Sequence, residues 1–84
     1  MAKHDKVLKD VFHEPTKGNV AWIDIESLVK HNGGEMHEGA GSRVRFCLNG
    51  VRAVFHRPHP GKEAGKRTVE SVRTFLTNAG VVPC

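Results

Sequence analysis

The sequence predicts an α+β domain in which helices cover one face of a three-stranded antiparallel sheet. The first observation is a hairpin pattern over residues 43–56, where two runs of alternating apolar and polar residues flank Asn49-Gly50. The second is the helical spacing of apolar residues in three segments, two before the hairpin and one after it. Because an apolar sheet face has to be buried against helices, these patterns predict the order α-α-β-β-β-α.

The two helices before the hairpin are delimited by turn residues. The first is expected over about residues 3–13, where the apolar stripe stops before Pro15. The second is expected over about residues 24–32, with Asp24 as its N-cap and Gly33-Gly34 at its end.

The remaining elements show the same kinds of signal. Residues 35–38 alternate as a short polar edge strand, and a Gly-rich loop leads into the hairpin. After the hairpin, Pro58, Pro60 and Gly61 exclude regular structure. Thr68 is then expected to cap a final helix that ends at Gly80.

The hairpin is the strongest local signal in the chain. Both central residues of a type I′ turn need positive φ, which Asn and Gly tolerate at the least cost. A two-residue loop sets the register, which pairs Leu48 with Val51, Phe46 with Ala53, Val44 with Phe55, and Arg43 with His56. One face of the hairpin is therefore apolar. The other face carries three guanidinium groups and one imidazole, from Arg43, Arg45, Arg52 and His56, and it suits a polyanion.

Length and charge support a single basic domain. With 84 residues the chain is large enough for one core, so residues 1–84 are expected to form one domain. Residues 1–40 carry five Lys and seven Asp or Glu, a net charge of −2, whereas residues 41–84 carry eight Lys or Arg and two Glu, a net charge of +6. The basic character thus belongs to the hairpin and the C-terminal segment after it, which favours an anionic partner such as nucleic acid.

The cysteines and the hydropathy pattern indicate a soluble cytoplasmic protein. Cys47 and Cys84 form no disulfide framework. The chain starts without an apolar signal segment and has no apolar run near the roughly 20 residues that span a bilayer. We therefore expect no membrane partner.

The spacing of the six histidines argues against a metal site. His56 and His59 are the one close pair. They lie at a strand end with Pro58 and Pro60 nearby, without the Cys or His pairs typical of zinc sites. We expect no metal and no small-molecule cofactor. His4, His13 and His31 are interpreted as solvated helix residues. His37, on the edge strand, can join the polar face of the hairpin.

His56 and His59 are the candidates for acid–base chemistry. An imidazole can take a proton from a ribose 2′-hydroxyl or give one to a departing 5′-oxygen, while Arg43 or Arg45 stabilises the charged phosphorane. The simpler alternative is that His56 is an exposed strand residue and that His59 fills a Pro-rich turn. The Trp and Phe residues all fall on apolar faces, so RNA contacts would rest on charge and shape and be weakly sequence-specific.

Several motifs together resemble the HicA toxins of bacterial toxin–antitoxin modules. They are Gly41-Ser42-Arg43-Val44-Arg45-Phe46, the hairpin, His59-Pro60-Gly61-Lys62-Glu63, and the helix end Leu76-Thr77-Asn78-Ala79-Gly80. The resemblance covers residues 22–80 and implies a double-stranded-RNA-binding-like α-β-β-β-α fold. It also implies metal-independent cleavage of mRNA and neutralisation by a HicB antitoxin. The helix within residues 1–15 lies outside the usual outline of the family.

One position departs from the family pattern. The family motif is usually Gly-Ser-His, with a catalytic His at the position that Arg43 occupies here. His59 matches the family pattern, and His56 is the residue that the register places beside the altered position. The predicted catalytic residues are therefore His56, His59 and Arg43, and the predicted RNA-binding residues are Ser42, Arg43, Arg45, Arg52, Arg57 and Lys62.

Two other hypotheses remain open. In the first, the chain is a catalytically inactive double-stranded-RNA-binding-like module that binds RNA or an antitoxin-like partner. In the second, it is a protein-interaction domain without a nucleic-acid ligand.

Overall fold

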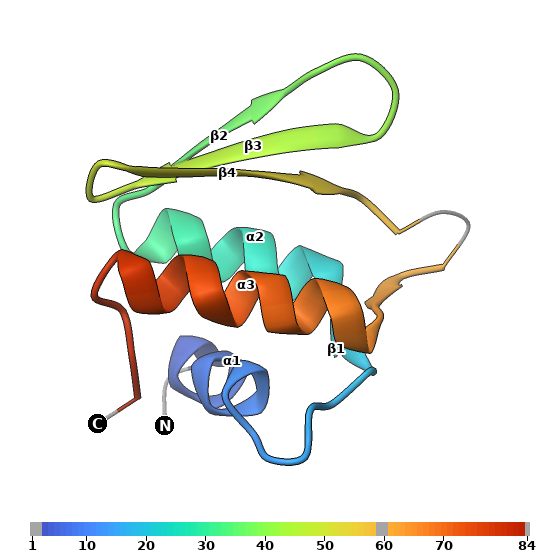
Figure 1. Cartoon of the computed structure of the whole chain (residues 1–84), viewed down its shortest axis with the longest axis vertical. Helices are drawn as coiled ribbons and strands as arrows, with labels where there is room; N and C mark the ends of the chain where they lie inside the picture. The colour runs from blue at the N-terminus through green and yellow to red at the C-terminus, as the bar shows by residue number, and fades with distance from the viewer. Residues whose placement is uncertain (1–2, 59–60, 84) are drawn as a thin grey trace.

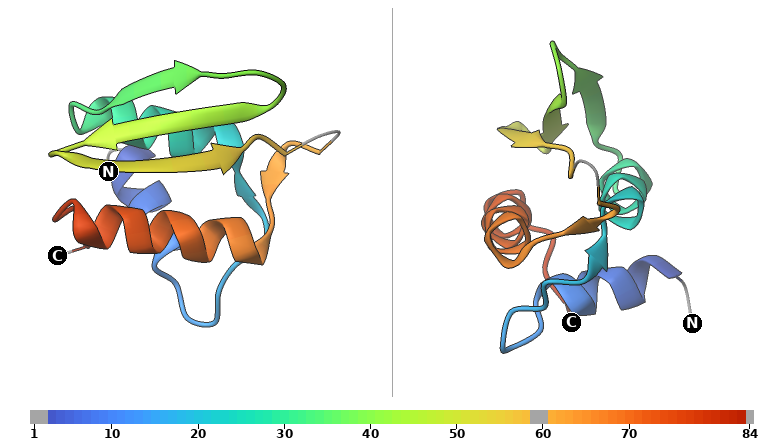
Figure 2. Two further views of the ribbon diagram at one scale, coloured as in Figure 1. Left: turned by 45° about the horizontal axis from the view of Figure 1, so that its top comes forward. Right: turned by 90° about the vertical axis from the view of Figure 1, so that its right-hand side faces the viewer.

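Three layers stack in the protein, namely a three-stranded sheet, two helices side by side beneath it, and one further helix on the far side (Figure 1). The computed structural model describes residues 3–58 and 61–83. The elements in chain order are α1 (Lys3–Val11), β1 (Val20–Ala21), α2 (Trp22–His31), β2 (Glu35–Glu38), β3 (Arg43–Leu48), β4 (Val51–His56), β5 (Glu63–Ala64) and α3 (Lys66–Asn78). The predicted α+β class is confirmed, with α2 and α3 covering one face of the sheet (Figure 2).

The large sheet has the predicted antiparallel register. Its strand order is β2-β3-β4, and the β3–β4 pairing runs from Leu48 opposite Val51 to Arg43 opposite His56. Asn49 and Gly50 have φ values of 51° and 81°, as a tight turn with two positive φ angles requires. Because the register is correct, the side chains fall on the predicted faces of the hairpin.

Aromatic rings from four elements meet under the sheet. The ring centroid of Phe46 on β3 lies 5.8 Å from that of Trp22 on α2, 5.4 Å from that of Phe55 on β4 and 6.0 Å from that of Phe75 on α3. Phe46 has no exposed surface. These contacts fix the helix layer against the strands that carry the polar face.

A second, two-stranded sheet was not expected. Strand β1 pairs with β5 so that Val20 lies opposite Ala64, and both residues are buried. The expectation of irregular structure after Pro58 is therefore wrong from Glu63 onward, while Pro60 lies outside the described residues. Strands of two residues are too short to show an alternating pattern in the sequence.

The starts of α2 and α3 also differ from the prediction. Helix α2 begins at Trp22 rather than after Asp24, and the backbone N–H of Trp22 donates to the carbonyl oxygen of Lys62 at 2.9 Å. Helix α3 begins at Lys66, with Gly65 rather than Thr68 as its N-cap residue. Strand β1 ends directly before α2, and β5 ends two residues before α3, so both helices start next to a strand pairing that the local sequence does not encode.

Helix α1 ends at Val11, two residues before the predicted end. The carbonyl of Val11 would bond to the backbone N–H of residue 15, but Pro15 has none. The side chain of Arg73 on α3 supplies the donors instead. Its Nε donates to the oxygen of Val11 at 3.1 Å and its Nη2 to the oxygen of His13 at 3.1 Å, so α3 holds the end of α1 in place.

The described residues contain no helix with the length and apolar character needed to cross a bilayer.

Gly34, between α2 and β2, is a position where a side chain does not fit. A Cβ there would lie 2.6 Å from Val29 Cγ1, 2.9 Å from the oxygen of Val29 and 3.1 Å from the oxygen of Cys47. Two of these atoms belong to the backbone, so we expect Gly34→Ala to lower the free energy of unfolding by about 1–3 kcal/mol in urea denaturation. Gly61→Ala is the control, because a Cβ there meets nothing within 4 Å. Equal stability of wild type and Gly34→Ala would contradict this close approach.

Candidate functional site

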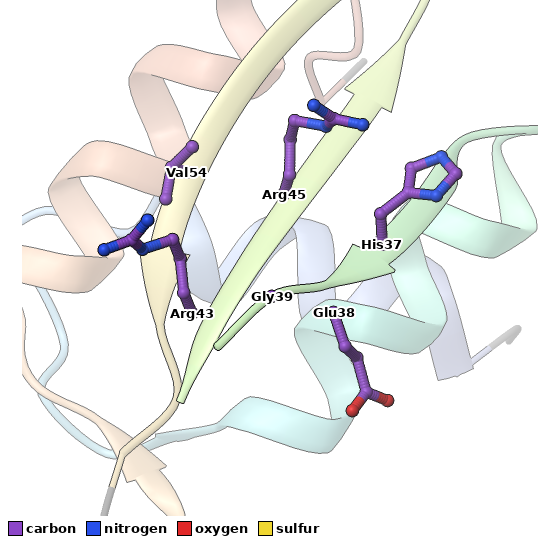
Figure 3. Close-up of a pocket in the computed structure, with 6 residues that line it drawn as sticks. All are labelled: His37, Glu38, Gly39, Arg43, Arg45 and Val54. Atoms are coloured by element: carbon purple, nitrogen blue, oxygen red, sulfur yellow. The ribbon is translucent and has the colours of Figure 1, made fainter. Parts of the chain in front are cut away.

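The exposed face of the large sheet carries an open hollow of about 300 Å³. Its lining comes from all three strands of that sheet and the residue after β2: His37, Glu38, Gly39, Arg43, Arg45 and Val54. Figure 3 shows the side chains of His37, Arg43, Arg45 and Val54 on one side of the sheet, while Glu38 points to the other side. The hollow thus combines two guanidinium groups, one imidazole and an apolar floor.

The register explains why these groups share one face. Arg45 lies directly opposite His37 on β2 and Val54 on β4, and Arg43 lies directly opposite His56. Directly opposite residues in a sheet project to the same side. His37 therefore joins the polar face, as the sequence allowed, and both edge strands bring an imidazole next to an arginine of β3.

The other predicted RNA-binding residues lie at different distances from this hollow. Arg52 projects from the same face but pairs with Cys47 near the hairpin turn, at the opposite end of β3 from Arg43. Ser42 is exposed immediately before β3, and its carbonyl oxygen accepts a hydrogen bond from the backbone N–H of Arg57 at 2.8 Å. Lys62 lines a second hollow of about 280 Å³, with Trp22, Ile23 and Pro58 among its neighbours.

Arg57 forms ion pairs with two carboxylates. Its Nη2 lies 3.2 Å from Glu38 Oε2, and its Nε donates to Glu26 Oε2 at 3.0 Å. The hydrogen bonds to Glu38 and then to Glu26 raise the pKa of Arg57 above its ordinary value. Its charge is balanced within the protein, so Arg57 joins the end of β4 to α2 and β2.

Glu26 is the buried centre of this arrangement. Its side chain is 7% exposed, and Oε2 also accepts the indole N–H of Trp22. Sequence reasoning missed Glu26, although a signal was present. The residue lies four positions after Trp22 and directly after Ile25, on the buried stripe of α2. A carboxylate at such a position needs a cationic partner, which here is Arg57.

The histidines outside the sheet do not all match their prediction as solvated residues. The rings of His4 and His31 stack with centroids 4.1 Å apart, and a hydrogen bond of 2.8 Å joins His4 Nε2 to Ser27 Oγ. His31 is nevertheless exposed, as predicted, whereas His4 is half-buried in the contact between α1 and α2. His13 is exposed but comes after α1 instead of lying within it. His59 lies outside the described residues.

Within residues 3–58 and 61–83, no group of three or more His, Cys, Asp or Glu side chains is placed to hold a metal ion.

Fold and site together describe a small α+β domain with a basic sheet face bordered by imidazoles. The family model described as HicA toxin of bacterial toxin–antitoxin matches residues 22–81, which run from the start of α2 to just beyond α3. The chain belongs to the HicA toxin family. It is thus a toxin of a bacterial toxin–antitoxin module, a class whose members are generally ribonucleases, and an antitoxin is its partner. Searches of curated proteins and of solved structures gave no match.

Proposed function

We propose that this toxin is an endoribonuclease that cleaves mRNA without a metal ion. The observation that carries the proposal is the register of the sheet, which sets His56 beside Arg43 and His37 beside Arg45 on one exposed face. Imidazoles supply proton transfer near neutral pH, and guanidinium groups stabilise charge on a phosphate. The family position that usually carries His holds Arg43 here, and the neighbouring strand offers His56 in its place.

In the proposed reaction, RNA crosses β3 with its scissile phosphate between Arg43 and Arg45. His56 accepts the proton of the ribose 2′-hydroxyl, whose oxygen attacks the phosphorus while the 5′-oxygen leaves. We also propose His59 as a catalytic residue. The flanking RNA is proposed to contact Ser42, Arg45, Arg52, Arg57 and Lys62, of which Arg57 contributes least because two carboxylates balance its charge.

We further propose a HicB-like antitoxin as the partner, and the cytoplasm, where mRNA is exposed, as the place of action. The chain would work as one domain, in which residues 22–80 form the toxin core and residues 1–15 add a helix to it. The contact between α1 and the core through Arg73 supports this arrangement.

A catalytically inactive binding module is the second candidate. Arg43 favours it, because this residue stands where the family usually has its catalytic imidazole. Such a module would bind RNA or an antitoxin-like partner across the same basic face without cutting.

The two candidates are separated by incubating the purified chain with a structured and an unstructured RNA in excess chelator. We expect cleavage that leaves 2′,3′-cyclic phosphate and 5′-hydroxyl ends, detected by gel electrophoresis and mass spectrometry. Binding without cleavage by the folded protein would reject the ribonuclease and support the binding module.

The salt dependence of RNA binding tests the surface itself. Each phosphate that the protein neutralises contributes a slope of roughly −0.7 to log affinity against log salt on single strands. Arg45→Gln should therefore flatten the slope by about 0.7, measured by fluorescence anisotropy. Lys9→Gln removes one positive charge from an exposed position of α1, which lies on the side of α2 and α3 away from the large sheet (Figure 1), and should leave the slope unchanged. An unchanged slope in Arg45→Gln would show that RNA binds elsewhere.

A further inference from the structure

We infer that His37 is a second catalytic residue, the imidazolium that gives a proton to the departing 5′-oxygen while His56 accepts the proton of the 2′-hydroxyl. This inference rests on the proposed ribonuclease function and assigns the acid of the same site.

The two imidazoles lie on opposite sides of the arginine pair. His37 is on β2 opposite Arg45, and His56 is on β4 opposite Arg43, so β3 and both guanidinium groups run between them. From strand spacings of about 4.8 Å and a rise of about 3.4 Å per residue, their Cα atoms lie about 12 Å apart. Both side chains project from the same face, where each can lean toward a phosphate above β3.

This placement fits the geometry of the reaction. In an in-line displacement the attacking 2′-oxygen and the leaving 5′-oxygen lie on opposite sides of the phosphorus atom. A base and an acid that serve these two oxygens must therefore approach from opposite sides of the phosphate. His56 and His37 do so across β3, whereas a single imidazole beside Arg43 would approach from one side only.

One carboxylate and two guanidinium groups surround His37. On the same strand, Glu35 Oε1 lies 3.3 Å from Nε2 of His37. On β3, Arg45 lies directly opposite His37, and Arg43 lies diagonally opposite it. A carboxylate that bonds one ring nitrogen orients the imidazole and leaves the other nitrogen to exchange a proton with substrate. The side chain of His37 is 51% exposed and lines the hollow that both arginines share, so RNA can reach it.

The proposed step balances without a further reactant. Neutral His56 takes the 2′-hydroxyl proton as the bond from the 2′-oxygen to phosphorus forms. The bond from phosphorus to the 5′-oxygen breaks, and protonated His37 delivers its proton to that oxygen. The products are a 2′,3′-cyclic phosphate and a 5′-hydroxyl, and exchange with water restores both imidazoles.

The test uses an oligonucleotide that the wild type cuts, synthesised with either oxygen or sulfur as the bridging 5′ atom at the cut site. A thiolate leaves without being protonated, so only the oxygen substrate needs the acid. We expect His37→Gln to slow cleavage of the oxygen substrate by about 10²–10⁴-fold and to cleave the sulfur substrate at the wild-type rate. His56→Gln should cleave both substrates more slowly than wild type. His13→Gln changes an exposed imidazole away from the sheet and should cleave both substrates at the wild-type rate.

Each other outcome overturns the inference. If His37→Gln cleaves the oxygen substrate as fast as wild type, or is slowed equally on both substrates, His37 is not the acid. If His59→Gln instead cleaves the oxygen substrate slowly and the sulfur substrate at the wild-type rate, the acid is His59. A folded wild type that binds RNA and cleaves neither substrate overturns the proposed function together with the inference. Thermal melting of His37→Gln shows whether the variant is folded. Glu35→Gln leaves the imidazole in place and should slow cleavage of the oxygen substrate but not of the sulfur substrate.

Discussion

Replacing His56 with Ala should lower the single-turnover rate of RNA cleavage by about 10²–10⁴-fold, because the 2′-hydroxyl would lose the group that accepts its proton. The imidazole is exposed on β4, so its removal should leave the melting temperature and RNA affinity close to those of wild type. In cells without an antitoxin, the variant should no longer arrest growth or deplete mRNA.

His13→Ala is the matched control for this experiment, since it removes an exposed imidazole away from the sheet. It should cleave RNA at the wild-type rate. Equal rates for wild type and His56→Ala would reject the role of His56. Complete loss of cleavage in His59→Ala alone would transfer that role to His59.

Glu26→Ala should be the most destabilising change around the site. It leaves the buried indole N–H of Trp22 without an acceptor, which costs about 1–3 kcal/mol, and it removes one carboxylate from Arg57. For a domain of this size each kcal/mol lowers the melting temperature by about 4–8 °C. Differential scanning calorimetry measures the effect.

Glu38→Ala is the matched control, because Glu38 pairs with the same guanidinium through a side chain that is 62% exposed. Its melting temperature should fall much less than that of Glu26→Ala. Equal losses in the two variants would mean that the buried contact with Trp22 contributes nothing beyond the ion pair. Because Arg57 also donates its backbone N–H to Ser42, Glu26→Ala should in addition loosen the start of β3.

Features encoded by neighbouring residues could be predicted from the sequence. The Asn49-Gly50 turn has a two-residue signature, and it determined the register that places Arg43, Arg45, Arg52 and His56 on one face. The position of His37 was harder to infer, because residues 39–42 connect β2 to β3 without such a signature. Its register relative to Arg45 became clear only from the structure.

Features that depend on remote pairings could not be predicted. The contact of Glu26 with Arg57 joins residues 31 positions apart, and the pairing of Val20 with Ala64 joins two strands of two residues each. No periodic pattern identifies the partner in either pairing, although the place of Glu26 on the buried stripe of α2 indicates that it needs a cationic partner. The same remoteness explains the misplaced start of α2, since the carbonyl of Lys62 accepts the first backbone N–H of that helix.

The candidate site also has a bearing on how the chain folds. Its sheet-face residues, from His37 to His56, all belong to strands β2, β3 and β4 within residues 35–56. Neighbouring strands that pair in this way close only short loops, so the face assembles from one compact stretch of chain. We therefore expect the pairing of the strands that carry Arg43 and both imidazoles to cost less loop-closure entropy than the contacts that join this sheet to α1 and α3.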